Sequence, residues 1–220
     1  MLINLDGSES PFFLSWRFGA AMQIAFDFHR RQIRKGTSIP YIAHLMGVCA
    51  LVLEAGGDED QAIAALLHDA VEDQGGLSTL DTIRHVFGER VALAVESCSD
   101  STASDPAKKL PWRERKEQYL AHLRSANRDA LIVAAADKLH NARAILSDYR
   151  ELGDNLWARF NASGQDQLWY YRKLAEMLCG TSAPKVLVNE LERVTSQLEQ
   201  LMNAPTRNLA TNASAESPTK

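Results

Sequence analysis

Apolar residues recur every three to four positions along most of this 220-residue chain, which is the spacing of amphipathic α-helices. Stretches that alternate apolar and polar residues, as half-buried strands do, are scarce. Pro40, Pro111 and Pro184 stand where the first turns of helices would begin. The pattern predicts helices over residues 16–34, 41–55, 59–73, 79–87, 89–98, 111–125, 128–147, 154–162, 165–179 and 184–202. We therefore expect an all-α fold.

A single compact domain is expected, because a chain of this length fills one sizeable core more readily than two. We place the domain at residues 16–202, after an N-terminal extension over residues 1–15. The segment that follows is small and polar, NAPTRNLATNASAESPTK, and such a composition predicts a disordered tail over residues 203–220. Residues 99–111 are the one long internal loop expected. The helix over 184–202 suits core packing better than contact with a second copy in a homo-oligomer.

The composition of the chain limits the classes of binding partner and the compartment that we expect. A net charge of -4 gives no general attraction to nucleic acid or to an anionic membrane. No apolar run approaches the roughly 20 residues of a membrane span, and the first residues lack the basic start of a signal peptide. Cys49, Cys98 and Cys179 are widely spaced in apolar surroundings, which predicts buried, reduced thiols. We expect a cytoplasmic protein.

The segment LLHDAVEDQ, residues 66–74, concentrates acidic residues without a Lys or Arg to balance them. On a helical wheel its apolar residues share one face and its polar residues the other. Carboxylates four residues apart repel each other on a helix, so a bound cation would explain the pattern. A solvated polar face explains it equally well. The polar residues are His68, Asp69, Glu72 and Asp73.

Two further helices offer partners for a cation. His44 is the only ionisable side chain between Tyr41 and Glu54, and Asp137 follows six consecutive apolar residues. A hydrogen-bonded core histidine and a structural ion pair are the alternative interpretations, although Lys138 is not expected on the correct face to pair with Asp137. Two imidazoles with two carboxylates suit Mn, Fe, Co or Zn better than Ca or Mg.

The segments GTSIPYIAH, ALLHDAVED and ADKLHNAR resemble the HD-domain metal-dependent phosphohydrolases, and most closely the (p)ppGpp hydrolase domain of the RelA/SpoT family, over about residues 20–180. The resemblance implies an HD-domain helical bundle that removes the 3′-pyrophosphate of (p)ppGpp to give GDP or GTP and pyrophosphate. It implies manganese held by His44, His68, Asp69 and Asp137. It further implies Glu72 and Asp73 as the catalytic acids, and Arg34, Lys35 and Asn141 as nucleotide contacts.

Two positions depart from that family. Gln74 and Ala144 stand where many members have Thr, and the second change leaves guanine specificity open. The alternatives are an HD phosphohydrolase of an adenine alarmone, NADPH or a nucleoside phosphate, and a nucleotide-binding regulator without catalysis. A small-molecule nucleotide is the expected partner, and nucleic acid is not expected. No synthetase or regulatory domain fits in the remaining residues, so we expect a stand-alone hydrolase. Two basic clusters could bind phosphates: Arg30, Arg31, Arg34 and Lys35, and then Lys108, Lys109, Arg113, Arg115 and Lys116.

Overall fold

The computed structural model describes residues 13–99 and 110–204 and is built from helices. Within these ranges the only β pairing is a single antiparallel bridge between Ile33 and Pro40. The prediction of an all-α fold is confirmed. The predicted extension, long loop and tail fall mostly or wholly outside the described residues and stay predictions. The elements are α1 Trp16–His29, α2 Ile42–Glu54, α3 Glu59–Leu67, α4 Ala70–Asp73, α5 Leu77–Phe87, α6 Glu89–Cys98, α7 Trp112–Arg124, α8 Arg128–Leu152, the 3₁₀ helix η2 Gly153–Arg159, α9 Gly164–Cys179 and α10 Lys185–Asn203.

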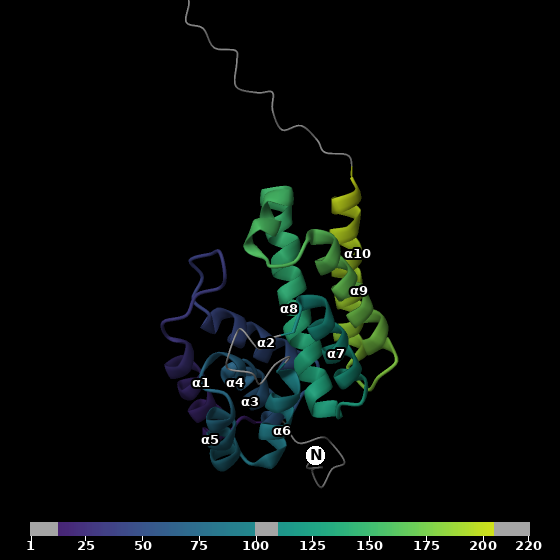
Figure 1. Cartoon of the computed structure of the whole chain (residues 1–220). Helices are drawn as coiled ribbons and strands as arrows, with labels where there is room; N and C mark the ends of the chain where they lie inside the picture. The colour runs from purple at the N-terminus through teal and green to yellow at the C-terminus, as the bar shows by residue number, and fades with distance from the viewer. Residues whose placement is uncertain (1–12, 100–109, 205–220) are drawn as a thin grey trace, which may run out of the picture.

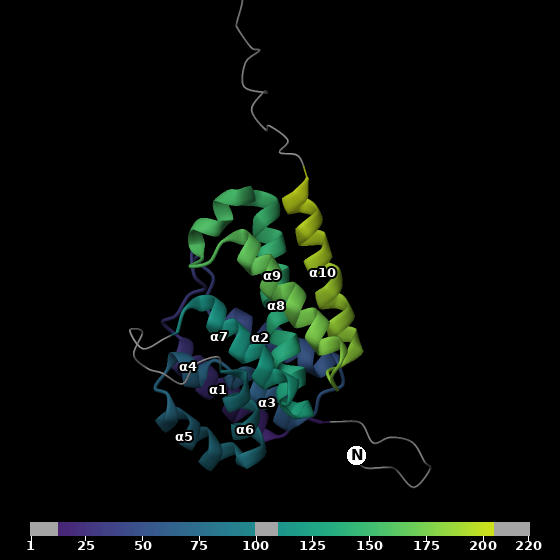
Figure 2. The same cartoon turned by 45° about the vertical axis from the view of Figure 1, so that its right-hand side comes forward.

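The long helix α8 organises the fold (Figure 1). Helices α2, α3 and α6 pack against its first half, while α1 packs on α3 and α5 packs on α6. Helices α9 and α10 lie beside α8 on the other side, as the turned view also shows (Figure 2). The apolar run from Leu131 to Ala136 is buried between these groups. Because α8 touches both groups, a polar residue on its inner face meets side chains from several elements.

The prediction of one helix over 59–73 is wrong in one respect, because the structure has two helices there. A capping box fixes the start of α3: the Asp58 side chain accepts from the Gln61 backbone, and the Gln61 side chain accepts from the Asp58 backbone. The helix ends at Leu67, and α4 begins at Ala70. His68 and Asp69 lie at the joint. The helical wheel also misplaces His68, which is buried because α3 is covered on every side: all residues 61–67 are buried.

Other boundaries differ from prediction for local reasons. Helix α1 stops at His29, and the following residues form a turn that ends in the bridge to Pro40. Helix α8 continues to Leu152 and ends at Gly153, whose φ of 55° is a conformation that glycine adopts readily. Cys49 and Cys98 are buried and free as predicted, but Cys179, the last residue of α9, is exposed.

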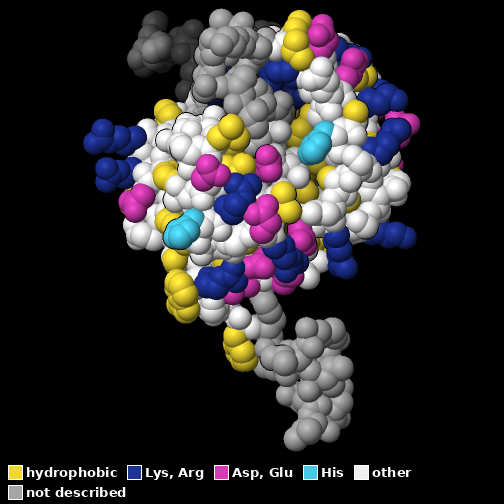
Figure 3. Space-filling view, turned by 60° about the horizontal axis from the view of Figure 1, so that its bottom comes forward, with side chains coloured by type: hydrophobic (Ala, Val, Ile, Leu, Met, Phe, Trp, Pro, Cys, Tyr) yellow, Lys and Arg dark blue, Asp and Glu magenta, His cyan; other side chains and the backbone are white. Residues whose placement is uncertain are grey.

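No helix within residues 13–99 and 110–204 combines the length and apolar character needed to cross a bilayer. On the face that carries α5 and α6, basic and acidic side chains are interspersed (Figure 3). Arg90 there pairs with Asp58 and Asp129, at 2.7 and 2.8 Å. This face therefore offers no single-sign patch for a polyanion.

Leu66→Ala tests the core between α3 and its neighbours. Leu66 is fully buried, so the truncation should leave a cavity and lower the free energy of unfolding by about 2–5 kcal/mol. Chemical denaturation measures the loss. The matched control is Leu77→Ala, because Leu77 is 60% exposed at the start of α5, and it should change stability little. Equal losses for the two variants would contradict the packing described for α3.

Candidate metal centre and active site

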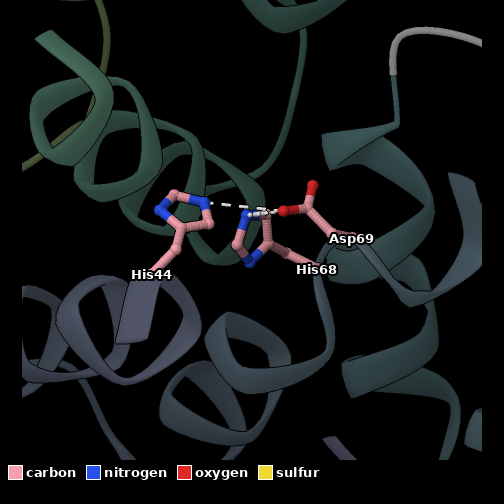
Figure 4. Close-up of side chains that lie close together, drawn as sticks. All are labelled: His44, His68 and Asp69. Carbon is pink, nitrogen blue, oxygen red and sulfur yellow. Dashed lines mark ion pairs between the residues drawn. The ribbon is translucent and has the colours of Figure 1, made fainter. Parts of the chain in front are cut away.

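Three parts of the chain bring two histidines and two aspartates together. His44 comes from α2, His68 and Asp69 from the joint between α3 and α4, and Asp137 from α8. Figure 4 shows the first three, whose ligand atoms all lie within 4.8 Å of one another. Asp137 Oδ1 lies 3.2 Å from His44 Nε2 and 3.6 Å from His68 Nε2. The four predicted ligands thus face one point.

The hydrogen bonds of His68 fix which ring nitrogen faces that point. His68 Nδ1 lies 2.7 Å from the Ala65 carbonyl oxygen, and a carbonyl only accepts, so Nδ1 carries the proton. Nε2 is then the atom directed at the carboxylates, 3.1 Å from Asp69 Oδ2. It is buried and has no hydrogen-bond partner among the described residues. A buried nitrogen lone pair of this kind suits a metal ligand.

The electrostatics also favour a cation. Burial acts to lower the pKa of His68, but the carboxylates of Asp69 and Asp137 outweigh it and hold that pKa well above its usual value. Burial raises the pKa of Asp69, but the neighbouring His68 and His44 bring it well below the usual range. Donors bound at about 2 Å to one ion lie roughly 3 Å apart, close to the separations found here. The donor set and its spacing therefore fit a divalent metal ion.

A second layer of side chains orients these four residues. The Tyr41 hydroxyl donates to Asp69 Oδ2 at 2.6 Å, and Asn141 Nδ2 donates to Asp137 Oδ1 at 2.6 Å. Lys138 Nζ lies 2.5 Å from Asp137 Oδ2. The prediction that Lys138 could not pair with Asp137 was wrong, because its long side chain curls back along α8 to the preceding residue. Such outer partners hold ligands in place.

His140 supports His44 from the neighbouring turn of α8. The two Nδ1 atoms lie 3.0 Å apart, so one of them donates a proton to the other. Burial, with the nearby His44 and Arg34, lowers the pKa of His140 to about 4. His140 can approach because α2 has glycine at position 47, where an added Cβ would lie 2.4 Å from His140 Nε2. His44, for which a lone core histidine was the alternative interpretation, thus pairs with the half-buried His140.

Glu72 and Asp73 lie on the short helix α4, next to the centre but outside it. Both are exposed. The Asp73 backbone amide donates to the Asp69 carbonyl at 3.0 Å, which places Asp73 one turn beyond Asp69. Its carboxylate accepts from Gln32 Nε2 at 2.7 Å. The acids can therefore exchange protons with solvent while they remain close to the centre.

A cavity of about 360 Å³ lies between α8, α7, α9 and the segment after α1. Arg34, Lys35 and Asn141, the three predicted nucleotide contacts, all line it, and so does Ala144. Arg34 Nη2 donates to Asn141 Oδ1 at 2.9 Å, and Lys35 Nζ donates to Asn161 at 3.3 Å. Five aromatic side chains complete much of the lining: Tyr41, Trp112, Phe160, Tyr170 and Tyr171.

Three more cations line the cavity: Lys116, Lys138 and Arg159. Only Lys116 belonged to a cluster singled out from the sequence. Arg159 comes from η2 and pairs with Asp148 at 3.0 Å. The Arg159 side chain packs against Gly36, where φ is 73° and an added Cβ would lie 2.6 Å from Arg159. Nothing near Arg159 in the sequence indicates a site. The one indication in the sequence was Gly36, at the start of the motif GTSIPYIAH, because a glycine allows another side chain to approach the backbone closely.

Only some members of each predicted basic cluster line this cavity. Arg30 and Arg31 do not line this cavity; with Gln32, Asp73 and Gln74 they border a separate, open surface pocket. In the second cluster, the Arg113 guanidinium lies over the Trp169 ring, 3.1 Å from its centre. Arg113 is therefore occupied in holding α7 to α9. Lys108 and Lys109 lie outside the described residues.

Comparisons with known proteins identify a matching family and several similar proteins. Residues 21–169 match the model of the HD domain family. The chain is 38% identical over 126 residues to the guanosine-3′,5′-bis(diphosphate) 3′-pyrophosphohydrolase MESH1 of Xenopus tropicalis. The aligned residues make up 56% of this chain and 66% of that enzyme, so the chain spans just under two thirds of the enzyme's length. It is 30% identical over 135 residues to the bifunctional (p)ppGpp synthase/hydrolase SpoT of Escherichia coli, covering 59% of this chain and 18% of that protein. A solved structure of a metazoan orthologue of SpoT that hydrolyses ppGpp superimposes with a TM-score of 0.68 at 27% identity, over 85% of this chain and 98% of that one.

Proposed function

Because this chain belongs to the HD domain family, we propose that it is a metal-dependent pyrophosphohydrolase that removes the 3′-pyrophosphate of (p)ppGpp. The relatives named above act on that nucleotide or carry its name. The proposal includes manganese as the metal, which a mixed nitrogen and oxygen donor set accepts. It also includes the cytoplasm as the compartment, where free nucleotides of this kind occur.

One contact carries the proposal. The Asn141 side chain donates to Asp137 in the metal centre and accepts from Arg34 at the wall of the cavity. Tyr41 and Lys138 likewise contact the centre and line the cavity. A ligand in the cavity would therefore lie directly beside the four metal ligands. The cavity offers aromatic faces for a base and cations for phosphates, as a nucleotide with two diphosphate groups requires.

The residues then divide the work. His44, His68, Asp69 and Asp137 would hold the ion. The chemistry that a divalent ion supplies when bound is the polarisation of a phosphoryl oxygen and the acidification of water. Asp73, with Glu72 beside it, would accept a proton from the attacking water as the water oxygen bonds to phosphorus and the bond between phosphorus and the ribose 3′-oxygen breaks. The 3′-oxygen would take up a proton from the acid pair or from solvent. Arg34, Lys35 and Arg159 would neutralise the charge of the phosphates.

Purified protein with Mn²⁺ should release pyrophosphate from ppGpp and leave GDP. GTP is the matched control, because it has the same base and no 3′-diphosphate. Pyrophosphate is measured with a coupled assay and the nucleotide by chromatography. Absence of turnover on ppGpp, with the metal bound, would overturn the proposal. Tight ppGpp binding without turnover would favour the regulator instead.

An adenine substrate is the second candidate, and Ala144 is the observation that favours it. Ala144 lines the cavity at a position where the resembled family often has Thr, so it offers one hydrogen-bonding group fewer. The adenine counterpart of ppGpp, and NADPH, should therefore be assayed beside ppGpp. A higher kcat/KM for either compound would move the assignment to that substrate and keep the same catalytic residues.

A further inference from the structure

The side chain of Gln32 joins the Asp73 carboxylate to two groups outside the metal centre. Its Nε2 donates to Asp73 Oδ2 at 2.7 Å. Its Oε1 lies 2.7 Å from His29 Nδ1 and accepts from Gln74 Nε2 at 3.2 Å. One amide thus connects the end of α1 with the end of α4. None of the roles assigned above uses Gln32 or Gln74.

This network allows one orientation of the amide. A carboxylate only accepts hydrogen bonds, so the NH₂ group of Gln32 must face Asp73. The amide oxygen also only accepts, so both His29 Nδ1 and Gln74 Nε2 must donate to it. A flipped amide would set oxygen against oxygen at Asp73. The direction of the hydrogen bond to Asp73 is therefore fixed by its two supports.

The supports are themselves held. His29 is 1% exposed and its ring stacks on Tyr41, with ring centres 5.2 Å apart. The Gln32 backbone amide donates to the His29 carbonyl at 2.9 Å, and the Gln32 carbonyl accepts from the Tyr41 amide at 3.0 Å. Tyr41 in turn donates to Asp69. Gln32 is thus fixed to the same frame as the metal ligands.

The Asp73 side chain depends on this hydrogen bond for its orientation, because the short helix α4 that carries it restrains it little. Helix α4 has four residues, and Gly75 and Gly76 follow it with φ of 125° and 65°. The side chain is exposed, so without a partner it would rotate among several conformers. A reacting group that is displaced by about 1 Å can cost roughly 100-fold in rate. The hydrogen bond from Gln32 therefore bears on the rate rather than on the fold.

We propose that Gln32 is a positioning residue that fixes the orientation of the Asp73 carboxylate, with His29 and Gln74 fixing the amide. The inference rests on the proposed role of Asp73 in proton transfer. Gln74 makes the arrangement particular to this chain. A threonine, which many members of the resembled family have at this position, lacks the reach of the glutamine amide.

The experiment replaces Gln32 with Met, which has a similar length and cannot make these hydrogen bonds. With ppGpp and Mn²⁺, kcat should fall by about 10- to 100-fold, while KM, metal content and Tm stay near those of the wild type. A purely structural role would lower Tm and leave kcat per folded molecule unchanged. Gln23→Met is the matched control, because Gln23 makes the same kind of bond, to Asp27 at 3.1 Å, on the exposed side of α1.

The outcomes separate this inference from the proposed function. A wild-type protein that turns over ppGpp, with unchanged kcat in Gln32→Met, would overturn the inference alone. A wild-type protein without turnover would overturn both. If Gln32→Met does not fold, Gln74→Met removes one support and leaves the amide, and its kcat should fall by about threefold at constant KM. An unchanged kcat in that variant would overturn the inference as well.

Discussion

Asp73→Asn is expected to lower kcat for pyrophosphate release by about 10²- to 10⁴-fold, the range typical of removing a general acid or base. This corresponds to about 3–5 kcal/mol of transition-state stabilisation. The amide oxygen of asparagine can still accept from Gln32, as Asp73 Oδ2 does, so the local structure should survive. What is lost is the ability to take up a proton. Steady-state kinetics with metal analysis on the same sample measures the effect.

Two comparisons sharpen that result. Asp81→Asn is the control, since Asp81 is an exposed aspartate on α5 that pairs with Arg84, and its kcat should match the wild type. Glu72→Gln tests how the two acids share the work. If Asp73→Asn keeps most of its activity while Glu72→Gln loses it, the proton transfer belongs to Glu72. If both variants keep it, neither acid transfers the proton.

His68→Ala should lose the bound metal and, with it, detectable turnover. The substitution removes a buried nitrogen that faces both carboxylates. An ion that binds only the native state at 100 times its Kd stabilises it by about 2.7 kcal/mol. For a domain of this size that is roughly 5–10 °C in Tm. Excess Mn²⁺ should therefore raise the Tm of the wild type and not that of His68→Ala, as differential scanning calorimetry can measure.

The control for that comparison is His85→Ala, because His85 is an exposed histidine on α5. Its metal content and its response to Mn²⁺ should match the wild type. Should His68→Ala fail to fold, chelation of the wild type provides the second measurement. Removal of the ion should lower Tm and stop turnover, and added Mn²⁺ should restore both. A wild-type Tm that is insensitive to chelator and to Mn²⁺ would argue against a metal at these residues.

The helices could be predicted from periodicity, because each has an apolar face that the core requires. The joint at His68 and Asp69 could not, since a wheel assumes that the helix continues through every polar residue. The wheel also assumes an exposed polar face, whereas all residues 61–67 of α3 are buried and His68 is buried with them. Lys138 shows a related limit. Spacing along a helix gives the direction of the first bonds of a side chain, and four flexible carbons allow its end to return to Asp137.

The candidate site could be predicted in part for a different reason. His44, His68, Asp69 and Asp137 stand out because ionisable residues interrupt apolar segments. Arg159 does not stand out, since it lies in a short 3₁₀ helix among other polar residues, and only the fold brings it to the cavity. Gln32 was missed because an amide carries no charge, and because two of its three hydrogen-bond partners, Asp73 and Gln74, lie far from it in the sequence and are brought to it by the fold.

The break between α3 and α4 has a consequence for protein design. In an unbroken helix, residues 68 and 72 would share one face, and the acids would compete with the histidine for the same space. Here His68 at the two-residue joint is buried and Asp69 is half-buried, whereas Glu72 and Asp73 are exposed. A designer who grafts this centre onto an idealised helical bundle therefore has to transfer two helix ends and the joint between them. A template made from one continuous helix would reproduce the residues without their separation.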